Sequence, residues 1–474
     1  MRVKFFVFSV MMGLAINASA QQGGTLTLQQ AIDAAVKNNA TVKQSEYNMQ
    51  TAGVTRKQAM GNMLPDLIGS ANHGINQGRS IDPFTNSYIN QQINFASYNL
   101  GSNVTVFNGF QLLNRYRQES LNYDAAKMDL QQQKDNITLD VIIAYLQVVS
   151  SQEQVAQLTA QTDLTRKQVQ RLEILHKEGN IPPLQLYDLR GQLGTDEISL
   201  VNARNNVEAQ KLALAALMNV PYDKNVVITA LTADEMSLVY ESDVESIYRA
   251  ATGQFAMVKA VELRRKAAVR GLQAARGWYS PQVFLSANLN TNYSSAAATQ
   301  SIVSVIDVPT DDYVVVNGNK FNVVTTQTNF NSQKISYGDQ FKNNYSTQVA
   351  LGLRIPFING LFARNQVSQA KLDLKYAEFT SQTTLLQLKQ AIEQAYLDMT
   401  SAQERYRLLR DQVAAYTESF RIAEVRFNAG LGTTIDYLTA KNNLDNARLN
   451  LVSARYAYVF RTKILDYYQS KPLF

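Results

Sequence analysis

Cysteine is absent from the 474-residue sequence, and histidine occurs only as His73 and His176. The absence of cysteine excludes disulfides, thiol catalysis, cysteine-ligated metal sites and a lipid anchor on an N-terminal cysteine. The HExxH, GxSxG and Walker A motifs are also missing, and no nucleophile has a base beside it. We therefore expect a protein that is not an enzyme and that holds no metal ion and no cofactor.

Long apolar runs are scarce as well. Beyond the N-terminus, no stretch reaches the roughly 18 uncharged apolar residues that a membrane-spanning helix needs. The apolar run from Phe5 to Ile16 follows Arg2 and Lys4 and precedes the small residues Asn17-Ala18-Ser19-Ala20. This order predicts a signal peptide over residues 1–20 and an exported chain, because the run is too short for an anchoring helix.

Charge is moderate and dispersed. Hydrophobic residues make up 45% of the chain and charged residues 18%, a composition that excludes a disordered protein. The formal net charge of +6 is not gathered into a basic patch, so we expect no nucleic-acid partner.

One regular apolar pattern stands out near the C-terminus, with alternating steps of three and four. Its members, the seam residues, are Leu385, Leu388, Ile392, Ala395, Met399, Ala402, Tyr406, Leu409, Val413, Tyr416, Phe420, Ala423 and Phe427. This period predicts a long helix whose one face packs against partner helices in a left-handed supercoil. Gly430 predicts the end of that helix, and a second pattern from Ile435 to Tyr467 predicts a returning helix.

The sequence contains an internal repeat of one structural unit. Residues 39–43 match residues 255–259, Leu64-Pro65 matches Ser280-Pro281, and the Val-Phe-Asn-Gly ending at Gly109 matches the Phe-Ile-Asn-Gly ending at Gly360. We expect a first repeat over residues 21–219, a linker over residues 220–243 and a second repeat over residues 244–474. Each repeat consists of a helix, two strands, a helix of about 70 residues and a returning helix, the long helix being on the order of 100 Å long.

The expected elements have the following bounds. In the first repeat they are helices 26–63, 109–178 and 184–218 and strands 64–75 and 92–107; in the second they are helices 244–279, 360–429 and 433–468 and strands 281–293 and 344–357. Residues 294–343 form a long loop, in which Asn317-Gly318 predicts a hairpin with a type I′ turn. We expect this loop on the extracellular side.

The strand segments alternate between apolar and polar residues. Val349, Leu351 and Leu353 share one face of the last strand, whereas Gln348 and Ala350 share the other. Such alternation fits the sheet of a soluble β-sandwich or a membrane barrel with water inside. Aromatic residues gather where strands meet helices, as rings do at a membrane interface: Phe107, Phe110, Trp278, Tyr279, Phe357 and Phe362. Four strands cannot close a barrel in lipid, so two, three or four copies would have to join.

These features together resemble the TolC family of outer-membrane efflux channels. The resemblance covers nearly the whole mature chain and is most specific in the run Arg-Phe-Asn-Ala-Gly-Leu-Gly-Thr-Thr-Ile-Asp-Tyr-Leu over residues 426–438. It implies a mainly helical fold with membrane strands: a homotrimer with one twelve-stranded β-barrel and a twelve-helix periplasmic α-barrel. It also implies an outer-membrane exit duct for small toxic molecules or proteins, fed by an inner-membrane pump through a periplasmic adapter in a tripartite efflux or type I secretion system. From the residues alone, a soluble periplasmic coiled-coil protein, structural or adapter-like, remains the alternative.

The resemblance also assigns candidate site residues. The adapter would dock on the two helix tips: Gly179, Asn180, Ile181 and Pro182 in the first repeat, and Gly430, Leu431, Gly432 and Thr433 in the second. Asp436 matches the first aspartate of the family's inner gate, Thr439 replaces the second, and Gly432 replaces an arginine. Independently of the family, Thr433 and Asp436 have the spacing of a helix capping box. The role of Asp436 is therefore left open between lining the pore and capping the helix.

Overall fold

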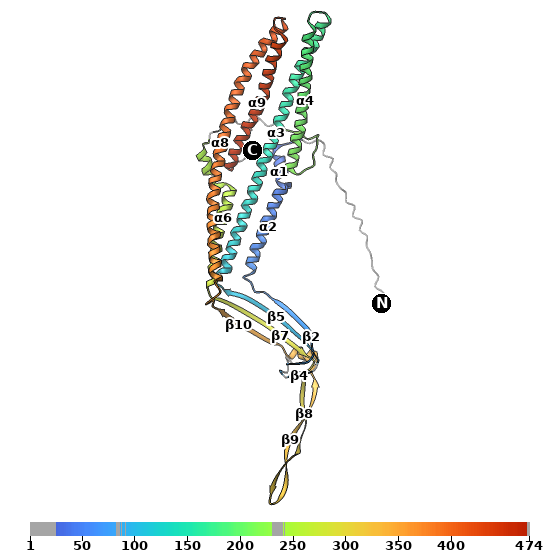
Figure 1. Ribbon diagram of the computed structural model, residues 1–474, viewed down its shortest axis with the longest axis vertical. Coiled ribbons are helices and arrows are strands. Elements are labelled where there is room, and N and C mark those ends of the chain that lie inside the picture. The colour runs from blue at the N-terminus through green and yellow to red at the C-terminus, as the bar shows by residue number, and fades with distance from the viewer. Residues whose placement is uncertain are drawn as a thin grey trace, which may run out of the picture. The chain divides into compact units, whose positions relative to one another are not determined.

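The computed structural model of the chain describes residues 25–81, 86, 88–90, 92–229, 240 and 242–471 (Figure 1). The predicted signal peptide and residues 230–239 and 241 of the predicted linker lie outside these residues. The chain divides into two compact units. Within the described residues, a helical unit lies in residues 25–51, 123–264 and 378–471, and a strand unit lies in residues 52–122 and 265–377.

Four helices dominate the helical unit. Helices α3 (Gln111–Lys177) and α8 (Phe362–Asn428) have 67 residues each, and α4 (Pro183–Met218) and α9 (Thr434–Tyr468) return beside them as the first and second hairpins (Figure 1). The seam residues of α8 are all buried or half-buried. Between Ala402 and Ala423, all residues of α8 outside the seam are exposed. The predicted period therefore identifies the packed face of this helix.

The first helix of each repeat is interrupted, whereas the sequence predicted continuous helices over residues 26–63 and 244–279. Helix α1 (Leu28–Asn38) is separated from α2 (Ala40–Gly61) by the extended residue Asn39, whose ψ is 133°. Helix α5 (Val244–Gln254) is separated from α6 (Ala256–Arg276) by Phe255, whose ψ is 129°. A 3₁₀ turn, Gly277–Tyr279, follows α6. The two breaks fall at matching positions of the repeats, so the break belongs to the duplicated unit.

Side chains stabilise both breaks. The Asn39 amide donates to the carbonyl of Leu217 at 2.9 Å, and its oxygen accepts the backbone N–H of Thr41 at 2.9 Å. Phe255 is buried with its ring against Tyr467 at 5.1 Å. Near these breaks, β1 (Thr25–Leu26) pairs in parallel with β6 (Val227–Ile228), which lies in the predicted linker. The apolar periodicity of the helices does not reveal this packing around the two breaks and the β1–β6 pair.

The strand unit contains an antiparallel sheet in the order β10-β7-β5-β2. The strands are β2 (Ile68–Asn76), β5 (Ile93–Phe107), β7 (Gln282–Ser294) and β10 (Ser346–Arg354). The central pair β5–β7 joins the two repeats. Among the described strands, none pairs with the outer edge of β2 or of β10.

The register gives this sheet one apolar and one polar face. Leu351 lies opposite Leu285, which lies opposite Val104 on the next strand. The other face carries Asn288 and Asn290, and the amide of Asn290 bonds that of Asn99. A bulge after Thr105 places Phe107 opposite Val283, on the apolar face.

The long loop of the second repeat has internal structure. Strands β8 (Ala298–Val316) and β9 (Asn319–Lys334) form the hairpin predicted around Asn317-Gly318, where both turn residues have positive φ, 52° and 83°. A short hairpin, β3 (Arg79–Ile81) with β4 (Tyr88–Asn90), lies between β2 and β5. A seven-residue helix, α7 (Tyr337–Asn343), was not predicted. No helix in the described part of the chain has both the length and the apolarity to cross a membrane.

Candidate functional site

Both hairpins turn at a glycine in the left-handed conformation. Gly179 has φ 74° and Gly430 has φ 75°. After each glycine, a backbone N–H reaches back to the carbonyl five residues earlier: Asn180 to Leu175 at 2.9 Å, and Leu431 to Arg426 at 2.8 Å. These bonds satisfy carbonyls that the ending helix leaves unpaired. The two tips therefore share one geometry, and a side chain at Gly179 or Gly430 would strain the turn.

The second tip restarts as α9 through a capping box. The Thr433 hydroxyl accepts the backbone N–H of Asp436 at 3.1 Å, and the Asp436 carboxylate accepts the backbone N–H of Thr433 at 3.3 Å. The same carboxylate accepts the Thr433 hydroxyl at 2.8 Å. These hydrogen bonds from Thr433, aided by the charge of Arg426, hold the pKa of Asp436 below its ordinary value. The capping role of Asp436 is thus present in the structure.

The remaining predicted gate residue, Thr439, lies one turn further along α9. Asp436 and Thr439 are both exposed and share the face of α9 that turns away from the core. At Gly432, an added Cβ would lie 3.2 Å from the backbone nitrogen of Phe427. The loop runs too close to the end of α8 for a side chain to enter at that position without a shift.

A buried cluster packs the two hairpins together near their tips. Tyr437 of α9 is fully buried and stacks on Phe427 of α8, with ring centroids 4.8 Å apart. Val169 and Leu172 of α3 and Leu186 and Leu189 of α4 complete the cluster. Arg171 of α3 also donates to the backbone carbonyl of Asn428 at 3.2 Å. The hairpins are therefore packed against each other at the tips and not merely adjacent.

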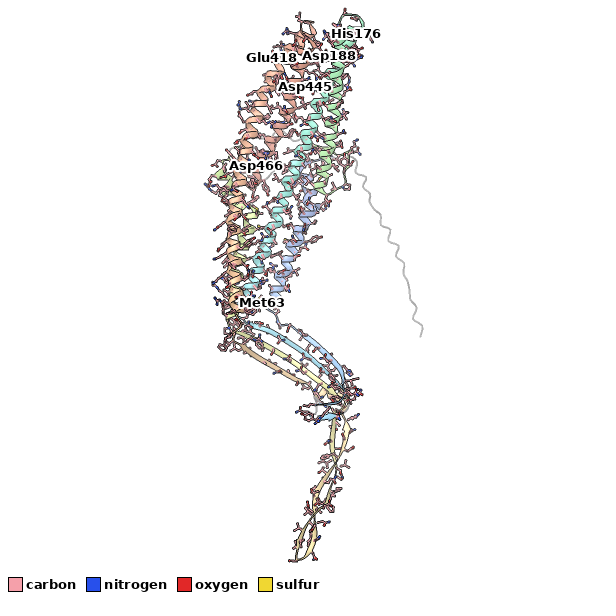
Figure 2. All side chains as sticks on the ribbon, in the orientation of Figure 1. Met63, His176, Asp188, Glu418, Asp445 and Asp466 are labelled. Atoms are coloured by element: carbon pink, nitrogen blue, oxygen red, sulfur yellow. The ribbon has the colours of Figure 1, made fainter. Side chains whose placement is uncertain are left out.

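An ionic cluster, which the sequence did not reveal, lies deeper between the hairpins. Lys441 of α9 is 1% exposed, and its ammonium lies 2.9 Å from Asp196 of α4 and 2.7 Å from Asp445. Figure 2 labels Asp445 on the second hairpin. Asp196 also accepts the Thr165 hydroxyl of α3 at 2.6 Å and the Gln192 amide at 2.7 Å. Burial raises the pKa of Asp445 above its ordinary value although Lys441 opposes the rise. Lys441 thus links α9 to α4, and Asp196 extends the link to Thr165 of α3.

The tips expose apolar side chains to solvent. In this single chain Leu431 is 74% exposed and Ile435 is 72% exposed; Leu184 and Tyr187 of the first tip are also exposed. Gly179, Asn180 and Pro182 are exposed too, while Ile181 is half-buried against the tip cluster. An exposed apolar surface on two hairpin turns can bind a partner protein.

The six predicted interface aromatics lie where the strands of the strand unit meet its helices. Phe107 contacts Phe110 edge to face at 5.4 Å, and Trp278 contacts Phe362 in the same way at 5.0 Å. Tyr279 and Phe357 are exposed. Gly109 and Phe110, like Gly360 and Leu361, are consecutive residues with positive φ, so each repeat turns from strand to helix in the same way.

The chain matches the profile of the family described as outer membrane efflux protein over residues 31–220 and 247–461. It is 20% identical over 453 residues to the outer membrane protein TolC of Escherichia coli K12, a match that covers 95% of this chain and 83% of TolC.

Within the described residues, no group of His, Asp or Glu could hold a metal ion. The family is one of transport proteins rather than enzymes.

Solved structures share the fold. The outer membrane protein VceC of Vibrio cholerae superposes with a TM-score of 0.74 at 16% identity, covering 94% of this chain and 97% of VceC. The open-state outer membrane channel MtrE of Neisseria gonorrhoeae superposes with a TM-score of 0.70 at 16% identity, covering 94% and 88%. The family match favours a membrane channel over a soluble coiled-coil protein, and the solved structures agree in fold. The chain belongs to the outer membrane efflux protein family and is an outer-membrane efflux channel with the fold of the TolC-like proteins.

Proposed function

We propose that three copies of the chain close into one channel, which serves as the passive exit duct of a tripartite efflux or type I secretion system. Each copy contributes four strands to a twelve-stranded barrel and four helices to a periplasmic tunnel. An inner-membrane pump supplies the energy and selects small toxic molecules or proteins. A periplasmic adapter connects pump and channel, and the duct itself carries out no catalysis.

The two open edges of the sheet carry this proposal. Within the described residues, no strand pairs with the outer edge of β2 or of β10, so each edge presents unpaired backbone donors and acceptors, and lipid offers them no partner. Pairing β10 of one copy with β2 of the next satisfies both edges and repeats around a ring until it closes. The apolar face would then meet lipid and the asparagine-rich face would line the water-filled lumen.

The strand length fits a membrane. Nine residues form β10, from Ser346 to Arg354. At about 3.4 Å per residue and a tilt of about 40°, they rise roughly 23 Å, close to the apolar band of about 25 Å that barrels present to lipid.

The long helices also expose apolar side chains to solvent in the single chain. Leu184, Tyr187, Ile198, Val201 and Leu212 are exposed along one face of α4. Leu386, Leu397, Leu408 and Ile422 are exposed on α8, on the side away from the seam. Stripes of this kind would be buried if α4 of one copy packed beside α8 of the next. This supports one closed tunnel rather than separate helical hairpins.

The lack of cysteine permits a direct test by disulfide trapping. Each variant carries two cysteines, one at a position between 69 and 75 of β2 and one at a position between 347 and 353 of β10. Within one chain these edges are three strand spacings apart, about 14 Å, which is too far for a disulfide. We expect bonds between copies that yield dimers and trimers on non-reducing gels. Only monomers across the whole scan would contradict the ring.

Adapter docking is tested at the second tip. Leu431→Ser removes the most exposed apolar side chain of that turn without altering Gly430. We expect weaker binding of the cognate adapter in surface plasmon resonance and loss of export in cells. Val314→Ser, the same kind of apolar-to-polar change at an exposed side chain of β8 away from the tips, is the matched control and should retain binding. Equal binding by both variants would place the docking surface elsewhere.

A further inference from the structure

The short helix α7 packs on the apolar face of the sheet, at the ends of β5 and β7 that are remote from the helix junction. Phe341 of α7 contacts Tyr98 of β5 edge to face, with centroids 5.6 Å apart. Tyr337 lies 4.5 Å from the ring of Tyr293, and the Thr291 hydroxyl donates to the backbone carbonyl of Phe341 at 3.0 Å. Tyr98 and Thr291 are register partners on the apolar face. The helix therefore covers the side of the sheet that would meet lipid.

Buried polar contacts hold α7 in place. Gln340 is 1% exposed; its amide nitrogen donates to the carbonyl of Ser294 at 2.9 Å, and its amide oxygen accepts the N–H of Ser294 at 2.9 Å. Asn344 donates to the carbonyl of Asn292 at 2.9 Å. These bonds use the backbone at the C-terminal end of β7, so α7 is held against that end of the sheet rather than forming a loose connection.

A groove of about 760 Å³ lies between α7 and the sheet. This volume lies in the range of about 300–1,000 Å³ typical of ligand pockets. Its walls are largely apolar and include Leu100, Leu289, Phe341 and Tyr345. Leu100 and Leu289 remain 42% and 43% exposed although α7 stands beside them. The groove can therefore accept an apolar chain without repacking.

The groove carries one charge, that of Lys342. No ion pair to Lys342 occurs in the described part of the chain, and its side chain is exposed. Strands β2, β5, β7 and β10 contain no aspartate or glutamate. An apolar groove with an unpaired ammonium among its lining residues is complementary to a lipid with an anionic headgroup.

The aromatic residues place this groove at a membrane surface. Tyr98, Tyr293, Tyr337, Phe341 and Tyr345 form a second aromatic cluster, at the opposite end of the strands from Phe107 and Phe357. Barrels carry aromatic girdles at both interfaces. If the strands cross the outer membrane as proposed, with the helices in the periplasm, this second cluster lies at the outer leaflet.

We propose that the groove binds a lipid of the outer leaflet, of the acylated and phosphorylated glycolipid class of lipid A. An acyl chain lies between α7 and Leu289, and a headgroup phosphate pairs with Lys342. This assignment rests on the proposed membrane orientation of the barrel. The bound lipid covers the apolar face left open beside α7 and ties the channel to one leaflet.

The test uses the purified full-length channel in detergent, with lipid A added in mixed micelles and bound lipid counted by native mass spectrometry. Leu289→Trp fills the groove, and we expect it to abolish retained lipid A. Lys342→Gln removes the phosphate partner, and we expect affinity to fall about tenfold. Controls are Leu353→Trp, at the other end of the same face, and Lys320→Gln, in the turn region of the β8–β9 hairpin.

Three outcomes overturn the site: no retained lipid A, equal retention by Leu289→Trp and Leu353→Trp, or retention of phosphatidylglycerol as tight as that of lipid A. The last outcome would assign the groove to a general anionic lipid. Single-channel conductance of the same preparations is measured in parallel. A conducting channel that retains no lipid A contradicts this inference alone, whereas loss of conductance and of trimers in the unmutated protein contradicts the proposed function.

Discussion

At the scale of single residues, Asp436 has one observed role, as a helix cap, and one proposed role, in lining the pore, and mutation can separate them. The structure shows the cap, in which its carboxylate and the Thr433 hydroxyl bond each other's backbone N–H groups. Pore lining is a proposal that follows from its exposed position beside the tip. Because the pKa of Asp436 is lowered, the carboxylate is ionised at neutral pH, and three copies would form an acidic ring that favours cations.

We predict that Asp436→Asn lowers cation preference in planar-bilayer recordings, because the amide keeps an acceptor for the cap but lacks the charge. Thr433→Ala should leave selectivity unchanged and should weaken the start of α9 by about 1 kcal/mol in thermal unfolding. Unchanged selectivity in Asp436→Asn would leave only the cap. A lowered pKa adds stability above the unfolded value, about 3.9 for aspartate, and this contribution is lost as pH falls through the folded pKa.

Lys441 is the residue whose loss should cost most. It is buried between Asp196 and Asp445, so Lys441→Met would leave two carboxylates without the ammonium that pairs with both. Breaking a buried pair in this way costs about 3–5 kcal/mol. We predict a marked fall in the melting temperature of the detergent-solubilised channel, and channels that open more readily, because the link between the hairpins is lost.

Asp445→Asn is the matched control for Lys441→Met. It leaves one cation with one carboxylate and should cost far less than Lys441→Met. The raised pKa of Asp445 means that the folded state binds this proton more tightly, so stability falls as pH rises above about 3.9 through the folded pKa. Asp445→Asn should remove that fall. If both variants melt alike at neutral pH, the cluster does not act as described.

Whether a contact between two side chains could be predicted depended on how far apart the two residues lie in the sequence. The capping box is local, so Thr433 and Asp436 could be recognised from their spacing alone. The partner of Lys441, Asp196, lies 245 residues away on another hairpin, and no local pattern links them. The breaks at Asn39 and Phe255 were missed because no proline marks either position and helix-forming sequence continues on both sides. Asn38-Asn39 before Ala40 was one available signal, since asparagine favours helix starts.

At the scale of elements, the apolar patterns of α8 and of the strands were sufficient to predict which faces pack. The packed face of α8 was predicted correctly because a 3.5-residue apolar period sustained over many turns is typical of one structure, a helix packed along a supercoil. The strand order β10-β7-β5-β2 could not be derived, because alternation gives faces but not neighbours. Helix α7 was missed because seven residues carry too little periodicity, although Ser336 caps it through Asp339.

The two faces of β10 should respond differently to the same substitution. Leu351→Arg places a charge on the apolar face near the middle of the strand, at a cost of about 2–4 kcal/mol in lipid. We predict loss of the heat-modifiable oligomer and of outer-membrane recovery. Gln348→Arg, on the opposite face, should assemble normally and shift ion selectivity toward anions. The reverse result would mean that the asparagine-rich face meets lipid.

The β8–β9 hairpin should be dispensable for assembly. Within the described residues, β8 and β9 pair only with each other, and nearly all their side chains are exposed. We predict that replacing residues 302–330 with a short Gly-Ser turn leaves oligomer stability and conductance unchanged. A channel that dissociates after this deletion would show that the hairpins of neighbouring copies support one another.

At the scale of the whole molecule, strand pairing alone allows rings of two, three or four copies, and the proposal selects three. Co-expression of tagged and untagged chains distinguishes these cases. We predict four species in native mass spectrometry, with a total mass of three mature chains. Three species would indicate a dimer, and five would indicate a tetramer.

The unpaired edges of β2 and β10 also have a genetic consequence. A chain with a normal β2 and a defective β10 can still join a growing ring, yet the ring cannot close. In a cell that makes normal and defective chains equally, about one ring in eight would contain only normal copies if assembly is random. Edge mutations should therefore be dominant over the normal allele, whereas a chain that fails before export should be recessive.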